Sequence, residues 1–274
     1  MSNLTANYHS LQISATKQLS SGFSVSGFYV WSHALEMFEP DADGLSSPQD
    51  SGYFGTPFTS NNNSLGALGG GLQEEYGPMN ADIRSNAAMS GTLNIDYFHG
   101  DNKFVKEAVN GWQISPIVYL RSGGPFTVTT GSNKSFDSTG NQRPDAVAGQ
   151  NPVLDPHRCR VCATNGVLTA WFNTTAYTAN GPGVTGGIGP GGADGNVRRN
   201  SLYGPGFKDM DMGLFRNIKF ERGIVFQLRG EATNILNWVS LNNPTASLAS
   251  GNYGKITSAA GTQRIIQLGG RLNF

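Results

Sequence analysis

Residues 82–97, DIRSNAAMSGTLNIDY, decide the fold of this chain. Odd-numbered positions carry apolar or small residues, from Ile83 to Tyr97, and even-numbered positions, apart from Ala88, carry polar residues, from Asp82 to Asp96. A period of two residues places one set on each face of an extended strand. Strands in soluble proteins typically run for about five or six residues, whereas strands that cross an outer membrane need about 9–11. The length of this alternation therefore indicates a membrane-spanning strand.

The same alternation recurs along the chain. It predicts strands at residues 10–19, 23–31, 112–121, 209–220, 224–233 and 262–274, with a short one near Tyr253–Thr257. The apolar faces begin or end in aromatic residues, which prefer the level of the lipid headgroups. The sequence therefore predicts an all-β protein with an antiparallel transmembrane β-barrel. The alternative is a soluble β-sandwich adhesin, whose strands also alternate but are normally shorter.

Charged residues stand within the polar faces of these strands. The candidates for side chains that face a water-filled lumen are Arg84, Arg229, Glu231 and Arg271. We expect the last three to pair across neighbouring strands as a structural network, which is favoured over a role in substrate contact. Charges in mid-strand fit the polar interior of a barrel.

Two long loops, at residues 33–81 and 123–206, separate the predicted strands. Loops of this length are uncommon unless they are functional or disordered, so we expect them to be extracellular and to contact a ligand. If Phe274 ends a strand at the periplasmic side, strict alternation of the predicted strands puts both loops on the wrong side. One further strand within 123–206, at Pro125–Thr130 or Leu168–Tyr177, restores the order. The sequence thus predicts about nine or ten strands.

The composition excludes several classes of protein. The formal net charge is zero, which gives no reason to expect a nucleic-acid partner. Charged residues make up only 14% of the chain, and glycine accounts for 37 residues. No apolar run is long enough for a transmembrane helix, and the N-terminus does not have the pattern of a secretory signal. Because the export signal is missing and the predicted strands begin almost at the first residue, residues 1–274 are expected to be the C-terminal part of a larger barrel, with plug domain and signal peptide absent.

The motifs with possible chemistry are weak. Cys159 and Cys162, in HRCRVC, could be a redox-active pair, half of a zinc site or a local disulfide, and a structural or incidental pair in a loop is favoured. The glycine-rich GPGVTG at 181–186 lacks the strand and helix that nucleotide binding requires, and Asp41 and Asp43 lack the remaining ligands of a calcium loop. We expect no catalytic residue, no cofactor, no metal and no enzymatic activity.

Several segments, in order along almost the whole chain, match the motifs of one family. They are NYHSLQISATKQLSSGFSVSGFYVWSHAL (Asn7–Leu35), GWQISPIVYLRSGGPFTV (Gly111–Val128), WFNTTAY (Trp171–Tyr177), NSLYGPGFKDMDMGLFRNI (Asn200–Ile218), LRGEATNILN (Leu228–Asn237) and RIIQLGGRLNF (Arg264–Phe274). Together they resemble TonB-dependent outer-membrane receptors, in the subgroup that carries a carboxypeptidase-regulatory-like domain before the plug.

The resemblance implies a barrel of about 22 strands in the bacterial outer membrane, in contact with its lipid. It implies an N-terminal plug that couples to the TonB energy-transducing complex, which no residue of this chain matches. The expected function is import of an unknown extracellular ligand, bound at the outer loops, with energy transmitted by TonB. A passive porin-like barrel is the alternative. The terminal aromatic Phe274 is similar to the family's assembly signal, which the barrel-assembly machinery reads; an interfacial anchor is the simpler role.

Overall fold

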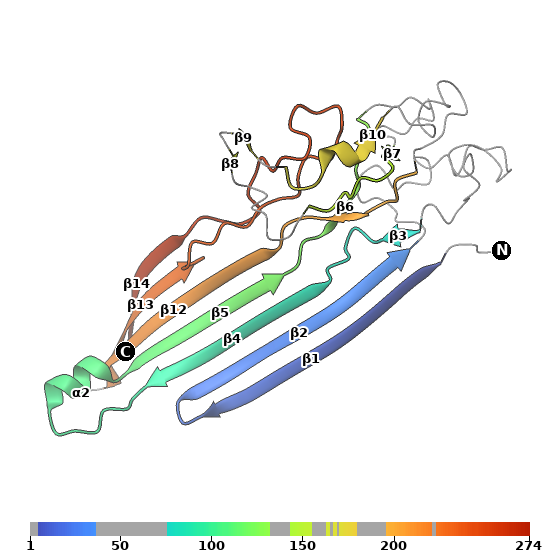
Figure 1. Cartoon of the computed structure of the whole chain (residues 1–274). Helices are drawn as coiled ribbons and strands as arrows, with labels where there is room; N and C mark the ends of the chain where they lie inside the picture. The colour runs from blue at the N-terminus through green and yellow to red at the C-terminus, as the bar shows by residue number, and fades with distance from the viewer. Residues whose placement is uncertain are drawn as a thin grey trace.

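Seven long strands form one antiparallel sheet in the computed structural model (Figure 1). The structure describes residues 5–36, 76–131, 143–154, 163–164, 167–168, 170–179, 196–220 and 223–274. The long strands are β1 (Ala6–Ser20), β2 (Phe23–Glu36), β4 (Ser85–Ile95), β5 (Trp112–Arg121), β12 (Phe207–Lys219), β13 (Val225–Thr233) and β14 (Ile265–Asn273). Each pairs with the next along the chain, and the two-residue β3 (Gly77–Pro78) also pairs with β2. The all-β antiparallel prediction is confirmed, and the sheet does not close on itself.

The strand register joins the apolar sets of all seven strands into one face. Residues directly opposite each other in an antiparallel pair lie on the same face of a sheet. One row across the sheet consists of Leu268, Gly230, Leu214, Ile114, Leu93 and Phe23. The neighbouring row on the other side consists of Gly269, Arg229, Phe215, Gln113 and Asn94. We call these two sides the apolar face and the polar face.

No second sheet covers the apolar face within the described part of the chain. Leu268 is 79% exposed, Ile266 65% and Leu228 43%. A β-sandwich requires such side chains to be buried together in its core, and they are not. Exposed aliphatic residues along a continuous face are instead what a barrel wall presents to lipid. The sandwich alternative is therefore wrong.

The two ends of the sheet differ in their connections. At the end that holds Phe274, the chain turns at Ser21 and Gly22, both with positive φ (52° and 76°), and between β12 and β13. The β4–β5 connection there contains the seven-residue helix α2 (Lys103–Val109). No described helix is long and apolar enough to span a membrane. The connections β2–β4, β5–β12 and β13–β14 all lie at the opposite end (Figure 1). We call these the Phe274 end and the loop end.

Among the described residues, this topology removes one of the predicted strands. Residues Tyr253–Thr257 form no strand: Tyr253 and Gly254 lie in a turn, with Gly254 at φ 77°, and residues 255–257 are irregular. Without that strand, the up-and-down order of the remaining long strands places both long loops at the loop end, opposite Phe274. The order therefore does not require a further strand within 123–206. The two candidates within 123–206 form only short pieces among the described residues: β6 (Pro125–Phe126), β9 (Val167–Leu168), β10 (Tyr177–Thr178) and a turn of 3-10 helix, η2 (Thr174–Ala176).

The connections at the loop end fold into a cap with a core of its own. The short pairs β6 with β11 (Leu202–Tyr203), β7 (Asp145–Ala146) with β10, and β8 (Ala163–Thr164) with β9 belong to it. At its centre Phe172 is only 2% exposed, and its ring lies 5.7 Å from Phe126, 6.0 Å from Tyr177 and 5.3 Å from Tyr253 between centroids. The buried aromatic core therefore lies above the strands, not between them.

Candidate ligand-binding site

A buried carboxylate ties the loop end of the sheet to the cap. The Asp82 side chain is fully buried. Its Oδ1 accepts a hydrogen bond from the Ala34 amide of β2 at 2.8 Å, and its Oδ2 accepts one from the Tyr203 hydroxyl of β11 at 2.8 Å. The Arg84 Nε lies 3.0 Å from the same Oδ2, and the His33 Nδ1 lies 3.4 Å from it. Asp82 thus joins β2, the start of β4 and the cap through one charged group.

The environment of Tyr203 keeps its hydroxyl protonated. Burial raises the pKa of Tyr203, and its hydrogen bond to the Asp82 carboxylate raises it further. The Arg84 Nε donates to the Tyr203 hydroxyl at 3.0 Å, and the guanidinium lies 5.4 Å from the centre of its ring. The hydroxyl therefore both accepts from Arg84 and donates to Asp82, which fixes its orientation.

A second buried network also holds the cap. Asn200 is 1% exposed and has a positive φ of 52°. Its side-chain amide donates to the Pro78 carbonyl at 2.8 Å and to the Asn80 Oδ1 at 2.6 Å, and its backbone amide donates to the Thr127 hydroxyl at 2.9 Å. The neighbouring Arg199 donates to the Glu36 carbonyl at 2.9 Å. The cap is thereby attached rigidly to β2 and β3.

A pocket of about 480 Å³ opens beside these networks at the loop end. It is lined by Asn80, Ile83, Arg121, Ser122, Gly124, Pro205, Phe207, Leu241, Asn242, Asn243 and Ala260. Arg121 and Phe207 are directly opposite each other on the polar face, and the guanidinium lies 5.2 Å from the ring centre. The lining has one cation, several amides and no carboxylate. These groups can bind a polar or anionic ligand but contain no nucleophile with an adjacent base.

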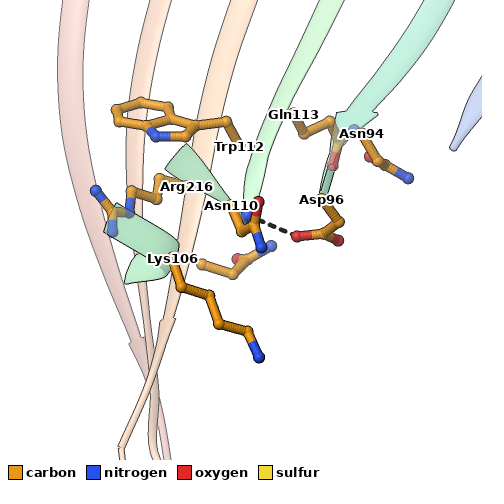
Figure 2. Close-up of a pocket in the computed structure, with 9 residues that line it drawn as sticks. Asn94, Asp96, Lys106, Asn110, Trp112, Gln113 and Arg216 are labelled. Atoms are coloured by element: carbon orange, nitrogen blue, oxygen red, sulfur yellow. Dashed lines mark hydrogen bonds between the residues drawn. The ribbon is translucent and has the colours of Figure 1, made fainter. Parts of the chain in front are cut away.

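A pocket of about 510 Å³ lies at the Phe274 end (Figure 2). In it the Asp96 Oδ1 accepts a hydrogen bond from the Gly111 amide at 2.8 Å, and the Arg216 guanidinium lies 5.2 Å from the Trp112 ring centre. The Trp112 indole also donates to the Ala108 carbonyl at 2.9 Å. These contacts hold the β4–β5 connection in place, so the pocket at the loop end is the better candidate for ligand binding.

The four charged residues predicted to face the lumen lie in different surroundings in the structure. Arg84 belongs to the Asp82 network at the start of β4. Arg229 and Glu231 are bonded to each other at 2.7 Å along one strand, β13, so the predicted pairing across strands is wrong for them. Arg271 lies opposite Gln227, on the same polar face. Phe274 follows β14 and is fully exposed.

Several predicted features lie outside the described residues. They are Asp41, Asp43, Cys159, Cys162 and the glycine-rich segment 181–186. Within the described ranges, no group of three or more potential metal-ligating side chains occurs.

Sequence reasoning missed the functions of Asp82 and Tyr203. The alternation predicts Asp82 on the polar face of a strand, whereas β4 begins only at Ser85. The Asp82 contact to Tyr203 spans 121 positions of the chain. The sequence offers one local signal for this network. Asp82 and Arg84 have opposite charges and lie two positions apart, so their side chains point to the same side of an extended chain.

One comparison identifies the family. The sequence model of a family described as "outer membrane beta barrel domain" matches residues 1–267. No curated protein and no solved structure matches the chain. The match covers almost the whole chain and agrees with the long antiparallel strands and the exposed apolar face. The chain belongs to this outer membrane β-barrel domain family and is located in the bacterial outer membrane.

Proposed function

We propose that this chain is the C-terminal part of the barrel of a TonB-dependent receptor, which binds a ligand at the loop end and imports it. The observation that carries the proposal is the rigid cap with a polar pocket at its base. Its parts come from the segments that resemble the receptor family: Phe172 of WFNTTAY fills the core, and Pro205 and Phe207 of GPGF line the pocket. A barrel that only formed a passive pore would not need this construction.

The rest of the assembly follows from the two faces of the sheet. The apolar face contacts lipid, and the polar face, with Arg229, Glu231 and Arg271, lines the lumen. The outward edges of β1 and β14 are unpaired in the sheet. Lipid does not tolerate open edges, so further strands, to about 22 in all, would complete the wall. An N-terminal plug would fill the lumen and contact TonB, and the barrel-assembly machinery would recognise Phe274.

In this proposal the protein performs no covalent chemistry. The ligand would enter the pocket from outside, where Arg121 offers a charge-assisted hydrogen bond and the amides of Asn242 and Asn243 offer both donors and acceptors. The absence of carboxylates from the pocket lining favours a ligand with acceptor groups or a negative charge.

The experiment compares a plugged receptor with an open pore. The protein is purified from outer membranes and inserted into planar lipid bilayers, and binding of the periplasmic domain of TonB is measured in parallel. We expect binding of TonB and almost no steady conductance. A large steady conductance without TonB binding would refute the proposal in favour of a passive porin-like barrel.

A further inference from the structure

A patch with two cations and exposed aliphatic residues lies at the loop end of the apolar face. It consists of Lys208, Leu236, Trp238, Val239 and Arg264, and we call it the rim patch. Lys208 is directly opposite Leu120, which places it on the apolar face of β12. Arg264 immediately precedes β14 and has the same parity as Ile266 and Leu268 of that face. The rim patch therefore continues the lipid-facing surface toward the loop end.

The segment that presents the aliphatic side chains is held firmly. Asn234, only 3% exposed, has a positive φ of 46°. Its side-chain oxygen accepts from the Trp238 amide at 2.8 Å, and its side-chain nitrogen donates to the carbonyls of Trp238 and Thr262, both at 2.9 Å. Leu236 and Val239 are nevertheless 51% and 68% exposed. Their exposure is a property of a fixed turn, which indicates that a hydrophobic partner covers them.

The two cations of the rim patch have no carboxylate partner among the described residues. The Lys208 ammonium lies 5.2 Å from the centre of the Trp238 ring. The Arg264 Nη1 donates to the Ile235 carbonyl, at a long 3.4 Å. The nearest acidic residues of β12, Asp209 and Asp211, have the parity of the polar face. A positive charge thus remains at the edge of an otherwise apolar surface.

We propose that the rim patch binds a phosphorylated, acylated glycolipid of the outer leaflet, that is, lipid A. Phosphate groups require Lys or Arg at the headgroup level, and acyl chains require aliphatic surface directly below it. The rim patch supplies the cations in Lys208 and Arg264, and the exposed Ile266 and Leu268 of the apolar face follow Arg264 along β14 toward the Phe274 end. The inference depends on the loop end being the outer end of the barrel, but not on transport driven by TonB.

The test measures lipid binding by the purified protein in detergent, by native mass spectrometry. The probes are bisphosphorylated lipid A, the same lipid without phosphates, and phosphatidylglycerol. We expect lipid A to bind best and the double variant K208Q/R264Q to bind it about 30-fold more weakly, given the usual contribution of a basic residue at a membrane surface. The conservative variant Lys208→Arg should bind as the unchanged protein does.

The matched control is Arg121→Gln, which removes a charge from the same end of the sheet but from its polar face. It should leave lipid A binding unchanged, and heat-dependent gel mobility confirms that each variant is folded. The inference is overturned if K208Q/R264Q binds lipid A as tightly as Arg121→Gln does. It is also overturned if phosphate-free lipid A or phosphatidylglycerol binds as well as lipid A. TonB binding of K208Q/R264Q, measured separately, should be unchanged.

Discussion

Replacing Leu268 by arginine puts a positive charge on the apolar face near the middle of β14. Leu268 is the fourth of the nine residues of this strand. At about 3.3 Å per residue and a tilt of about 40°, nine residues span roughly 23 Å, close to the height of the apolar band. Leu268 then lies within about 3 Å of the midplane. It faces Gly230 across the strand pair, so no neighbouring carboxylate is available on that face.

The expected cost follows from this depth. An arginine at the midplane of the lipid face of a barrel destabilises it by about 2–4 kcal/mol. The matched change is Gln267→Arg, one residue earlier and on the polar face, directly opposite Glu231. There the new charge meets a carboxylate, and an opposite-charge pair across strands stabilises by about 0.2–1 kcal/mol. The two variants should therefore differ by at least about 2 kcal/mol.

The assay is equilibrium unfolding of the protein in lipid vesicles by urea. The folded fraction is measured from heat-dependent gel mobility. If the slope of the unfolding free energy against urea concentration is the same for both variants, their unfolded states are comparable. Equal free energies of unfolding for Leu268→Arg and Gln267→Arg would refute the assignment of the two faces. A larger loss for Gln267→Arg would reverse it.

Three further predictions concern the C-terminus and the cap. Deletion of Phe274 should lower the amount of protein in the outer membrane, as measured by fractionation; an unchanged amount would leave Phe274 without a role as an assembly signal. Asp82→Ala leaves the Tyr203 hydroxyl and the Ala34 amide without their acceptor, so the cap should open more easily, by about 1–3 kcal/mol, as measured by hydrogen exchange of cap amides; unchanged protection would contradict the network. Burial raises the pKa of Tyr177 from 10.0 to about 12. The protonated hydroxyl therefore contributes stability to the cap that is fully present below pH 10 and is lost as the pH rises through 12. Tyr177→Phe should reduce this alkaline loss of stability in a pH titration of cap unfolding, and a titration identical to that of the unchanged protein would refute the prediction.

The strands were predictable from the sequence because alternation is a local property. Each long strand repeats its apolar residues every second position, and pairing with the next strand along the chain aligns those sets without further information. The error at Tyr253–Thr257 has a local cause as well. Alternation over so few residues is weak, and the amides of Tyr253 and Lys255 donate to carbonyls three residues earlier, which makes turns.

The candidate site was not predictable in the same way. Its groups come from positions far apart, such as Asp82 and Tyr203, and only the folded loops bring them together. Parity correctly placed Arg229 and Glu231 on one face, but it did not distinguish a partner two positions along the strand from one on the neighbouring strand. Side-chain geometry decides between those partners.

The register between β5 and β12 has a consequence for how such a protein could diversify. Arg121 and Phe207 are directly opposite each other, so the chain leaves the wall and returns to it at the same point, with the whole insert between them. The described residues of that insert pack around an aromatic centre above the wall, to which Tyr253 of the β13–β14 connection also contributes. The length and content of the insert can therefore change while the hydrogen bonds of the wall stay the same. Exchange of this single segment between relatives would give new recognition properties to an unaltered membrane scaffold.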